Sequence, residues 1–328
     1  MIWLQFIVSS ALLVAAAIKL AEYGDVIAIR TKLGGMLIGT LLLAGATSLP
    51  EFLTTINSIN QNVVDLAAGN LLGSNMFNMF MLAVLDMIFL GQRLLRKAAT
   101  KHALSGSLAT LMIGLVVFFI LADIDIRFGW VGLDSLIVMI TYIVGVLILQ
   151  GNKPLQTVEI EGDDLKNLPS LKKALLGFGI ATLVLVVVTP WLVRSSSGIA
   201  EITGISTGFI GTALLAIITS LPELVTTVSA VRVGAIDLAI GNLFGSNMFN
   251  MFAIGAADLF YLDGRFLSAI APGFVLVGLL GLLLTVFGLI GNLARLERKI
   301  LFLEIDALVL AISYFVGLWF LYNRGLGF

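Results

Sequence analysis

Two glutamates lie inside long apolar runs of this sequence, and each ends the same five-residue motif. The motif TSLPE occupies positions 47–51 and again 219–223, so that it places Glu51 and Glu223 at its ends. A carboxylate inside a bilayer is expensive and is therefore a candidate functional residue. The apolar runs around both glutamates contain no Lys or Arg. The pair therefore predicts a site that is visited by a mobile cation.

A proline directly precedes each glutamate, at Pro50 and Pro222. Proline lacks the backbone N–H and clashes with the preceding turn, so each helix is expected to kink or break there. We expect the break to release peptide oxygens near Ala44 and Ala216, which a membrane protein tolerates where backbone lines a cavity. Hydroxyl oxygens within a turn of the glutamates add to this set: Thr47, Ser48, Thr219 and Ser220.

A second motif is also written twice, as GNLLGSNMFNMF at 69–80 and GNLFGSNMFNMF at 241–252. Its glycines are spaced as small-xxx-small, which lets two helices approach closely. A serine and an asparagine follow one turn apart on one helical face, where they can present oxygens to one point. These pairs are Ser74 with Asn78 and Ser246 with Asn250. The other asparagines are predicted to bond between helices: Asn70, Asn75, Asn242 and Asn247.

The two motifs together offer carboxylate, hydroxyl, amide and peptide oxygens, with no nitrogen or sulfur ligand. The chain has no cysteine and one histidine, His102, which lies in a basic segment and is predicted to be a solvated loop residue. Hard cations such as Ca²⁺ and Na⁺ prefer an all-oxygen site. The candidate ligands are Glu51, Glu223, Thr47, Thr219, Ser48, Ser220, Ser74, Ser246, Asn78, Asn250, Ala44 and Ala216. No cofactor is expected beyond the bound ions.

Composition defines the protein class. The 328 residues are 59% hydrophobic and only 12% charged, which is too apolar for a soluble domain of this length. The net charge of −1 gives no electrostatic case for a nucleic-acid partner. We predict an all-α polytopic membrane protein, not an enzyme, because the chain lacks cysteine, a histidine pair and HExxH. Ten spans are predicted at about 2–22, 33–59, 64–91, 103–122, 129–149, 173–194, 206–231, 236–261, 268–292 and 300–322.

The chain contains an internal duplication, and the shift in numbering between its two copies is constant. Residues 38–86 align with 210–258 without a gap, and 28 of the 49 positions are identical. Each half contains five predicted spans, an odd number, so the copies would enter the membrane in opposite senses, as in secondary transporters. We predict two inverted five-helix repeats: 1–150 with motif 44–86, a cytoplasmic linker 151–172, and 173–328 with motif 216–258.

Basic residues predict the orientation, because cytoplasmic loops carry an excess of Lys and Arg. With the N-terminus outside, 15 of the 19 Lys and Arg residues fall on the cytoplasmic side and 4 on the outer side. Both termini are therefore expected outside, in the plasma membrane of a prokaryote. The matched aspartates Asp65 and Asp237 are expected to cap helices. Asp86 and Asp258 are predicted to lie near opposite membrane faces; a structural role is expected for them, and the alternative is that they line the two entry paths and attract cations.

The paired motifs resemble those of the calcium/cation antiporter superfamily, specifically its sodium/calcium exchanger branch. The resemblance implies exchange of Na⁺ for Ca²⁺ at one site that opens alternately to the two faces. It assigns Ca²⁺ to Glu51 and Glu223 with oxygens of Thr47 and Thr219. It assigns Na⁺ additionally to Ala44, Ser48, Ser74, Ala216, Ser220 and Ser246, and it completes the cluster with Asn78 and Asn250. Some relatives carry aspartate at the position of Asn250, which here is asparagine in both repeats.

Three alternatives remain open at the level of sequence. One is a proton/calcium antiporter, because a desolvated glutamate that loses its cation can take up a proton. Another is transport of a different divalent ion, and the third is a passive cation channel. The expected partners are Ca²⁺, Na⁺ or H⁺ and membrane lipid, with no obligatory protein partner.

Overall fold

The computed structural model describes residues 1–31, 45–89, 102–152, 168–294, 299–300, 303–324 and 326, and it is built almost entirely of helices. Six of the described helices are long and apolar enough to cross a membrane. They are α1 (Ile2–Thr31), α4 (Val64–Ile88), α6 (Ala103–Ala122), α7 (Leu133–Asn152), α9 (Leu171–Thr203) and α16 (Ile305–Arg324). The chain is therefore an all-α integral membrane protein, as its composition predicts.

A seventh span is broken where the sequence predicts. It begins with α10 (Thr207–Phe209), continues as the π-helix η1 (Ile210–Leu215) and ends with α11 (Ala216–Thr219). After Ser220 the chain bends by 41° into α12 (Leu221–Arg232), whose first turn contains Pro222. Pro50 occupies the same place at the start of α3 (Leu49–Asn60). Because proline suits a helix start and disrupts a helix interior, it places the break directly before each glutamate.

The remaining elements are α13 (Ile236–Ala257), the short α14 (Phe266–Ala269) and α15 (Phe274–Ala294). Two small hairpins precede α7 and α16. They pair β1 (Arg127–Phe128) with β2 (Val131–Gly132), and β3 (Lys299–Ile300) with β4 (Leu303–Glu304). Their registers pair Arg127 with Gly132 and Lys299 with Glu304, and the shift in numbering between the two hairpins equals that between the two motifs.

The repeat offset, defined as the shift in numbering that takes Glu51 to Glu223, also relates helices beyond the aligned motifs. It takes both ends of α3 to the ends of α12, and both ends of α7 to the ends of α16. The turn that follows α3 contains Asn62 with a left-handed φ of 57°, and the corresponding turn contains Gly234 with a φ of 81°. Asparagine and glycine are the residues that accept this conformation most readily. The duplication therefore preserves backbone conformation even where the sequence has changed.

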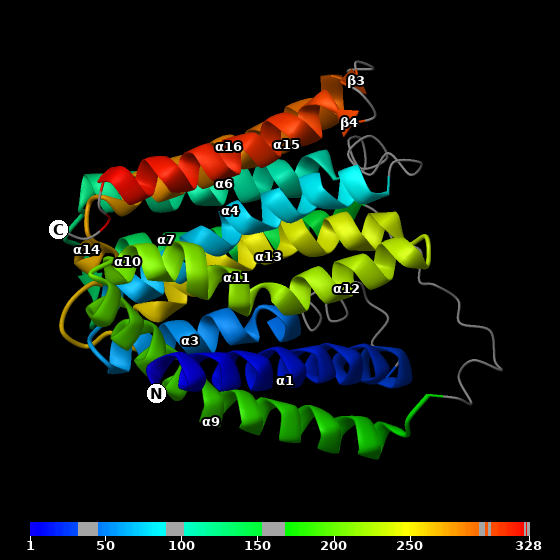
Figure 1. Cartoon of the computed structure of the whole chain (residues 1–328), viewed down its shortest axis with the longest axis horizontal. Helices are drawn as coiled ribbons and strands as arrows, with labels where there is room; N and C mark the ends of the chain where they lie inside the picture. Colours follow the sequence, from blue (N-terminus) through cyan, green and yellow to red (C-terminus); the bar gives the residue numbers. More distant parts are fainter. Residues whose placement is uncertain are drawn as a thin grey trace.

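The helices α4 and α13 lie at the centre of the molecule (Figure 1). The most apolar stretch of α4 is 78% buried, whereas the corresponding stretches of the other five long helices are 28–44% buried. The helices α1 and α9 lie side by side at one edge, and α15 and α16 at the opposite edge (Figure 1). Both copies of the glycine–asparagine motif are thus held in the interior.

Gly69 and Gly73 permit a close approach between α4 and the broken span. A Cβ added at Gly69 would lie 2.9 Å from Thr212 N, and one added at Gly73 would lie 2.7 Å from Thr212 Cα. Both contacts are with backbone, which cannot rotate away. The small-xxx-small prediction is confirmed for this pair, and it brings the π-helix against α4.

Several predicted positions differ from the structure. α1 and α9 continue to Thr31 and Thr203, past the predicted ends near 22 and 194, because a helix need not end where its apolar stretch ends. Asp65 and Asp237 are not helix caps, since α4 and α13 begin after Val63 and Ala235 with no side-chain capping bond. His102 is only 8% exposed, and its Nε2 lies 3.8 Å from Asp237 Oδ1, so the prediction of a solvated histidine was wrong.

Buried charges join the α6–α7 connection to the segment after α13. The Arg265 side chain is 3% exposed and pairs with Asp134 at 2.8 Å and also with Asp123. Asp258 is fully buried and accepts hydrogen bonds from Gly132 N at 2.6 Å and Phe266 N at 2.5 Å. Asp258 therefore anchors two backbone segments, which favours the structural role over an access path.

Substitution of Gly73 tests the close approach of α4 and η1. Gly73→Ala should lower the free energy of unfolding by about 1–3 kcal/mol, because the added methyl group meets rigid backbone. Gly281→Ala is the matched control, since its Cβ would lie 3.6 Å from the nearest atom, Met76 Cγ. Thermal unfolding of both variants in detergent measures the difference, and equal stability would contradict the assigned contact.

Candidate cation-binding site

The candidate ligands that the structure describes are all buried. None of Glu51, Glu223, Thr47, Thr219, Ser48, Ser220, Ser74, Ser246, Asn78, Asn250 and Ala216 is more than 1% exposed. Ala44, the twelfth candidate, lies outside the described residues. They come from the start of α3, from α11 and the start of α12, and from the middle of α4 and α13.

Each glutamate accepts a hydrogen bond from the other copy of the TSLPE motif. Ser220 Oγ donates to Glu51 Oε1 at 3.0 Å, and Ser48 Oγ donates to Glu223 Oε1 at the same distance. Ser48 Oγ also lies 3.2 Å from Ser246 Oγ, which brings α13 into the cluster. The two halves of the chain therefore meet at the carboxylates themselves.

The second oxygen of each carboxylate has no hydrogen-bond partner. This holds for Glu51 Oε2 and Glu223 Oε2, and also for Ser74 Oγ, Asn78 Oδ1 and Asn250 Oδ1. Buried polar atoms in proteins are almost always satisfied, because leaving one unpaired costs about 1–3 kcal/mol. Five such unpartnered oxygens therefore lie among the predicted ligands, where they are available to a cation.

The peptide oxygen of Ala216 is less free than the sequence suggests. It accepts a hydrogen bond from Ser220 N at 3.1 Å, so the break at Pro222 does not release it entirely. Thr219 Oγ1 also lies 3.4 Å from this oxygen, so a cation at Ala216 O would compete with a hydroxyl donor for the second lone pair. Thr219 Oγ1 donates to Asn70 Oδ1 at 3.0 Å and thereby joins α11 to α4.

Asparagines link the central helices as predicted. Asn78 Nδ2 donates to Asn247 Oδ1 at 2.9 Å, and Asn250 Nδ2 donates to Asn75 Oδ1 at 3.0 Å. Asn242 Nδ2 lies 3.3 Å from Thr226 Oγ1 and 3.2 Å from Thr227 Oγ1, which ties α13 to α12. The sequence analysis did not predict that Asn75 and Asn247 contact the candidate ligands of the opposite repeat. The identical spacing of the asparagines in the two motifs is the feature from which this pairing could have been predicted.

The electrostatics of the cluster match the sequence analysis. Among the described residues, no Lys or Arg forms an ion pair with Glu51 or Glu223. The same part of the chain contains no group of three or more His, Cys, Asp or Glu side chains that could hold a metal ion. The site therefore combines two carboxylates with neutral oxygens and is suited to a hard cation of low total charge.

Comparison with known proteins identifies the family. The family described as sodium/calcium exchanger protein matches residues 1–150 and 173–323, and the chain belongs to this family. Its members are membrane transporters, which agrees with the absence of catalytic motifs in the sequence. The chain is 29% identical to the inner membrane protein YrbG of Escherichia coli over 252 residues, which is 75% of each chain. It is 49% identical to the sodium/calcium exchanger MaX1 of Methanosarcina acetivorans over 88 residues, which is 25% of each chain.

Two solved structures share the fold. The H⁺/Ca²⁺ exchanger CAX matches with a TM-score of 0.69 and 15% identity, over 98% of this chain and 89% of that one. The sodium–calcium exchanger NCX_Mj matches with a TM-score of 0.58 and 21% identity, over 97% of this chain and 99% of that one. The chain therefore shares its all-α fold with both structures, one described as an H⁺/Ca²⁺ exchanger and the other as a sodium–calcium exchanger.

Proposed function

We propose that this protein is a secondary antiporter that exchanges Na⁺ for Ca²⁺ across the plasma membrane. The observation that carries this proposal is the buried pair Glu51 and Glu223, each with an unpartnered oxygen and without a fixed cation. Two carboxylates balance one Ca²⁺ ion. Three Na⁺ ions at the same pair would leave one positive charge, so the exchange would be electrogenic.

In this proposal the ion cluster is formed by the twelve oxygen-bearing positions predicted from the two motifs, Ala44 and Ala216 contributing peptide oxygens. Calcium would be held between Glu51 and Glu223 with oxygens of Thr47 and Thr219. Sodium would also use the serines, and Asn78 and Asn250 would complete the cluster. The unpartnered oxygens of Ser74, Asn78 and Asn250 support their inclusion.

The proposed architecture is ten spans in two inverted repeats, 1–150 and 173–328, with a cytoplasmic linker 151–172. The six long helices and the bent span account for seven of them. The span containing α3, together with α13 and α15, would complete the ten. The constant offset between equivalent helices supports this arrangement, and the distribution of basic residues supports both termini outside. The cation site would lie at the interface between the repeats.

Alternating access requires that the site open to one face at a time. The contact of α3 with α9 and the equivalent contact of α12 with α1 differ, and this difference is relevant to such opening. Two hydrogen bonds tie α3 to α9: Asn57 Nδ2 donates to Thr189 Oγ1 at 2.9 Å, and Gln61 Nε2 donates to Pro190 O at 3.1 Å. The repeat offset takes these four positions to Ser229, Ala17, Val233 and Ile18. No such bonds between α12 and α1 occur among the hydrogen bonds of the described residues.

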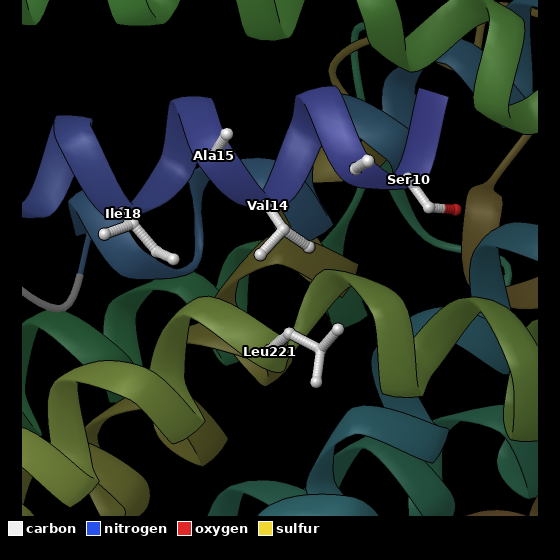
Figure 2. Close-up of a pocket in the computed structure, with 6 residues that line it drawn as sticks. Ser10, Val14, Ala15, Ile18 and Leu221 are labelled. Atoms are coloured by element: carbon white, nitrogen blue, oxygen red, sulfur yellow. The ribbon is translucent and has the colours of Figure 1, made fainter. Parts of the chain in front are cut away.

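Instead, an apolar groove of about 340 Å³ lies between α1 and α12 (Figure 2). It is lined by Ser10, Ala11, Val14, Ala15, Ile18 and Leu221. Leu221 directly follows Ser220, whose hydroxyl donates to Glu51. In the proposed mechanism, α1 and α9 move together relative to the central helices. The α3–α9 contact would then separate while the α1–α12 contact closes, and the reverse movement would restore the first state.

A proton/calcium antiporter is the second candidate. A carboxylate oxygen that loses its cation in an apolar interior can take up a proton instead. The structural likeness to the H⁺/Ca²⁺ exchanger keeps this candidate in consideration. A passive channel is less favoured, because channels are usually built from rings of ligands around a symmetric pore.

Transport in vesicles tests the coupling ion. Calcium uptake into proteoliposomes should be driven by an outward Na⁺ gradient and should respond to membrane potential. A proton gradient of equal size is the control. Uptake that ignores Na⁺ and follows the proton gradient would establish the second candidate, and uptake that requires neither gradient would favour a channel.

Substitution of the glutamates tests the site. Glu51→Gln and Glu223→Gln should each reduce calcium transport to background while the protein still inserts, because each change removes one of the two charges that balance Ca²⁺. Glu201→Gln, at an exposed position near the end of α9, is the matched control. Full transport by either variant would overturn the assignment.

Charge at position 250 tests selectivity. Asn250→Asp should change the ratio of Na⁺ to Ca²⁺ affinity by about tenfold without loss of folding, because ligand charge tunes cation affinity over orders of magnitude. Asn60→Asp at an exposed position is the control. Ion titrations monitored by thermal stability give both affinities, and an unchanged ratio would contradict a ligand role for Asn250.

A further inference from the structure

Four asparagines form two hydrogen-bonded pairs between α4 and α13. One pair joins Asn78 to Asn247 at 2.9 Å, and the other joins Asn250 to Asn75 at 3.0 Å. Each pair takes one residue from each copy of the GSNMFN motif, and the repeat offset converts one pair into the other. All four side chains are at most 1% exposed. These bonds therefore lie in the protein interior, between the two central helices.

The amide groups are used in two different ways. A side-chain amide has an oxygen that accepts and a nitrogen that donates. Asn78 and Asn250 donate through Nδ2 and keep Oδ1 unpartnered, whereas Asn75 and Asn247 accept through Oδ1 and keep Nδ2 unpartnered. Two of the four residues therefore offer an oxygen, and the other two do not.

This division matters because an amide can rotate by half a turn with little change of shape. In the rotated state, Asn78 or Asn250 would present N–H groups to a cation and would repel it. The acceptor oxygen of the opposite repeat opposes this rotation while its own amide keeps its orientation, since only the nitrogen can donate to it.

We propose that Asn75 and Asn247 are positioning residues that hold Asn250 and Asn78 with their oxygens toward the transported cation. The inference rests on the proposed function and deepens it. Asn75 and Asn247 do not bind the ion themselves, because their own oxygens are occupied. Each repeat thus orients one ligand of the other repeat.

Leucine at position 247 removes the acceptor and keeps a similar side-chain volume. Asn247→Leu should weaken Ca²⁺ binding about 10–100-fold, as is typical when a group that orients a metal ligand is lost. Asn247→Asp retains an acceptor oxygen for Asn78 Nδ2 and should bind Ca²⁺ at least as tightly as the parent protein. Radioactive Ca²⁺ binding to purified protein in detergent measures both. Weakening of equal size in the two variants would overturn the proposal.

A double-mutant cycle separates positioning from a general structural effect. If Asn247 acts only through Asn78, Asn78→Leu combined with Asn247→Leu should bind Ca²⁺ as weakly as Asn78→Leu alone. Asn78→Leu combined with Asn75→Leu is the matched control. Because Asn75 acts through Asn250, Asn75→Leu should weaken Ca²⁺ binding further, by a factor that multiplies the factor caused by Asn78→Leu. If the two factors multiply in both double variants, the proposal is overturned.

Unfolding measurements without cation establish that each variant folds. Where a leucine variant does not fold, Asn247→Ser replaces it with the same expectation, because its shorter side chain cannot reach Asn78. Ca²⁺ binding by the parent protein distinguishes failure of the proposed function from failure of the positioning role. If it binds no Ca²⁺, the proposed function fails. If it binds Ca²⁺ but the losses of affinity multiply in both double variants, only the positioning role fails.

Discussion

Two carboxylates buried in an apolar interior without a fixed cation are the constraint on which the rest of this structure depends. A charge in that environment is expensive, and removal of solvent strengthens every interaction that remains. Glu51 and Glu223 each receive one hydroxyl donor, and each keeps one oxygen unpartnered. One neutral hydrogen bond offsets part of the desolvation of a carboxylate but does not balance its charge. The fold therefore holds a pair of acids that is complete only with a positive partner, and this requirement explains why the protein binds cations reversibly in the proposed mechanism.

The serine hydroxyls that donate to these two carboxylates come from the opposite copy of the motif. Ser48 serves Glu223, Ser220 serves Glu51, and the asparagine pairs cross in the same way. Any ion that binds both glutamates therefore contacts groups whose orientation depends on both halves. A site of this kind responds to the relative position of the halves, because displacement of one half removes the partner of a ligand in the other. In the proposed mechanism, this dependence would link ion occupancy to conformation.

The sequence alone predicted the class of protein, the duplication and the burial of the candidate ligands that the structure describes. It also placed the helix breaks, since Pro50 and Pro222 allow little else. It did not predict which residues pair. The repeat predicts like environments for Asn75 and Asn247, but only the packing of α4 against α13 shows that each accepts a bond from the opposite copy. The π-helix before Ala216 was also not predicted, because no residue type marks it and it depends on contact with Gly69 and Gly73. His102 was misjudged because its burial arises from contact with α13, which is distant in sequence.

The two kinds of packing in this molecule have different consequences for motion. Gly69 and Gly73 place backbone of the broken span directly against α4, and backbone contacts of this kind leave no room for adjustment. At the edge, α1 meets α12 across an apolar groove lined by Ala11, Ala15 and other side chains, and the described residues form no hydrogen bond between these two helices. The two helices of this edge therefore differ, because α9 is hydrogen-bonded to α3 through Thr189 and Pro190, whereas α1 meets α12 across an apolar groove. In the proposed mechanism, the ligands would keep their geometry within each half while the path to them opens and closes. Gly69 and Gly73 thus hold the broken span against α4 by backbone contact, whereas the small residues of α1 face α12 without such a contact.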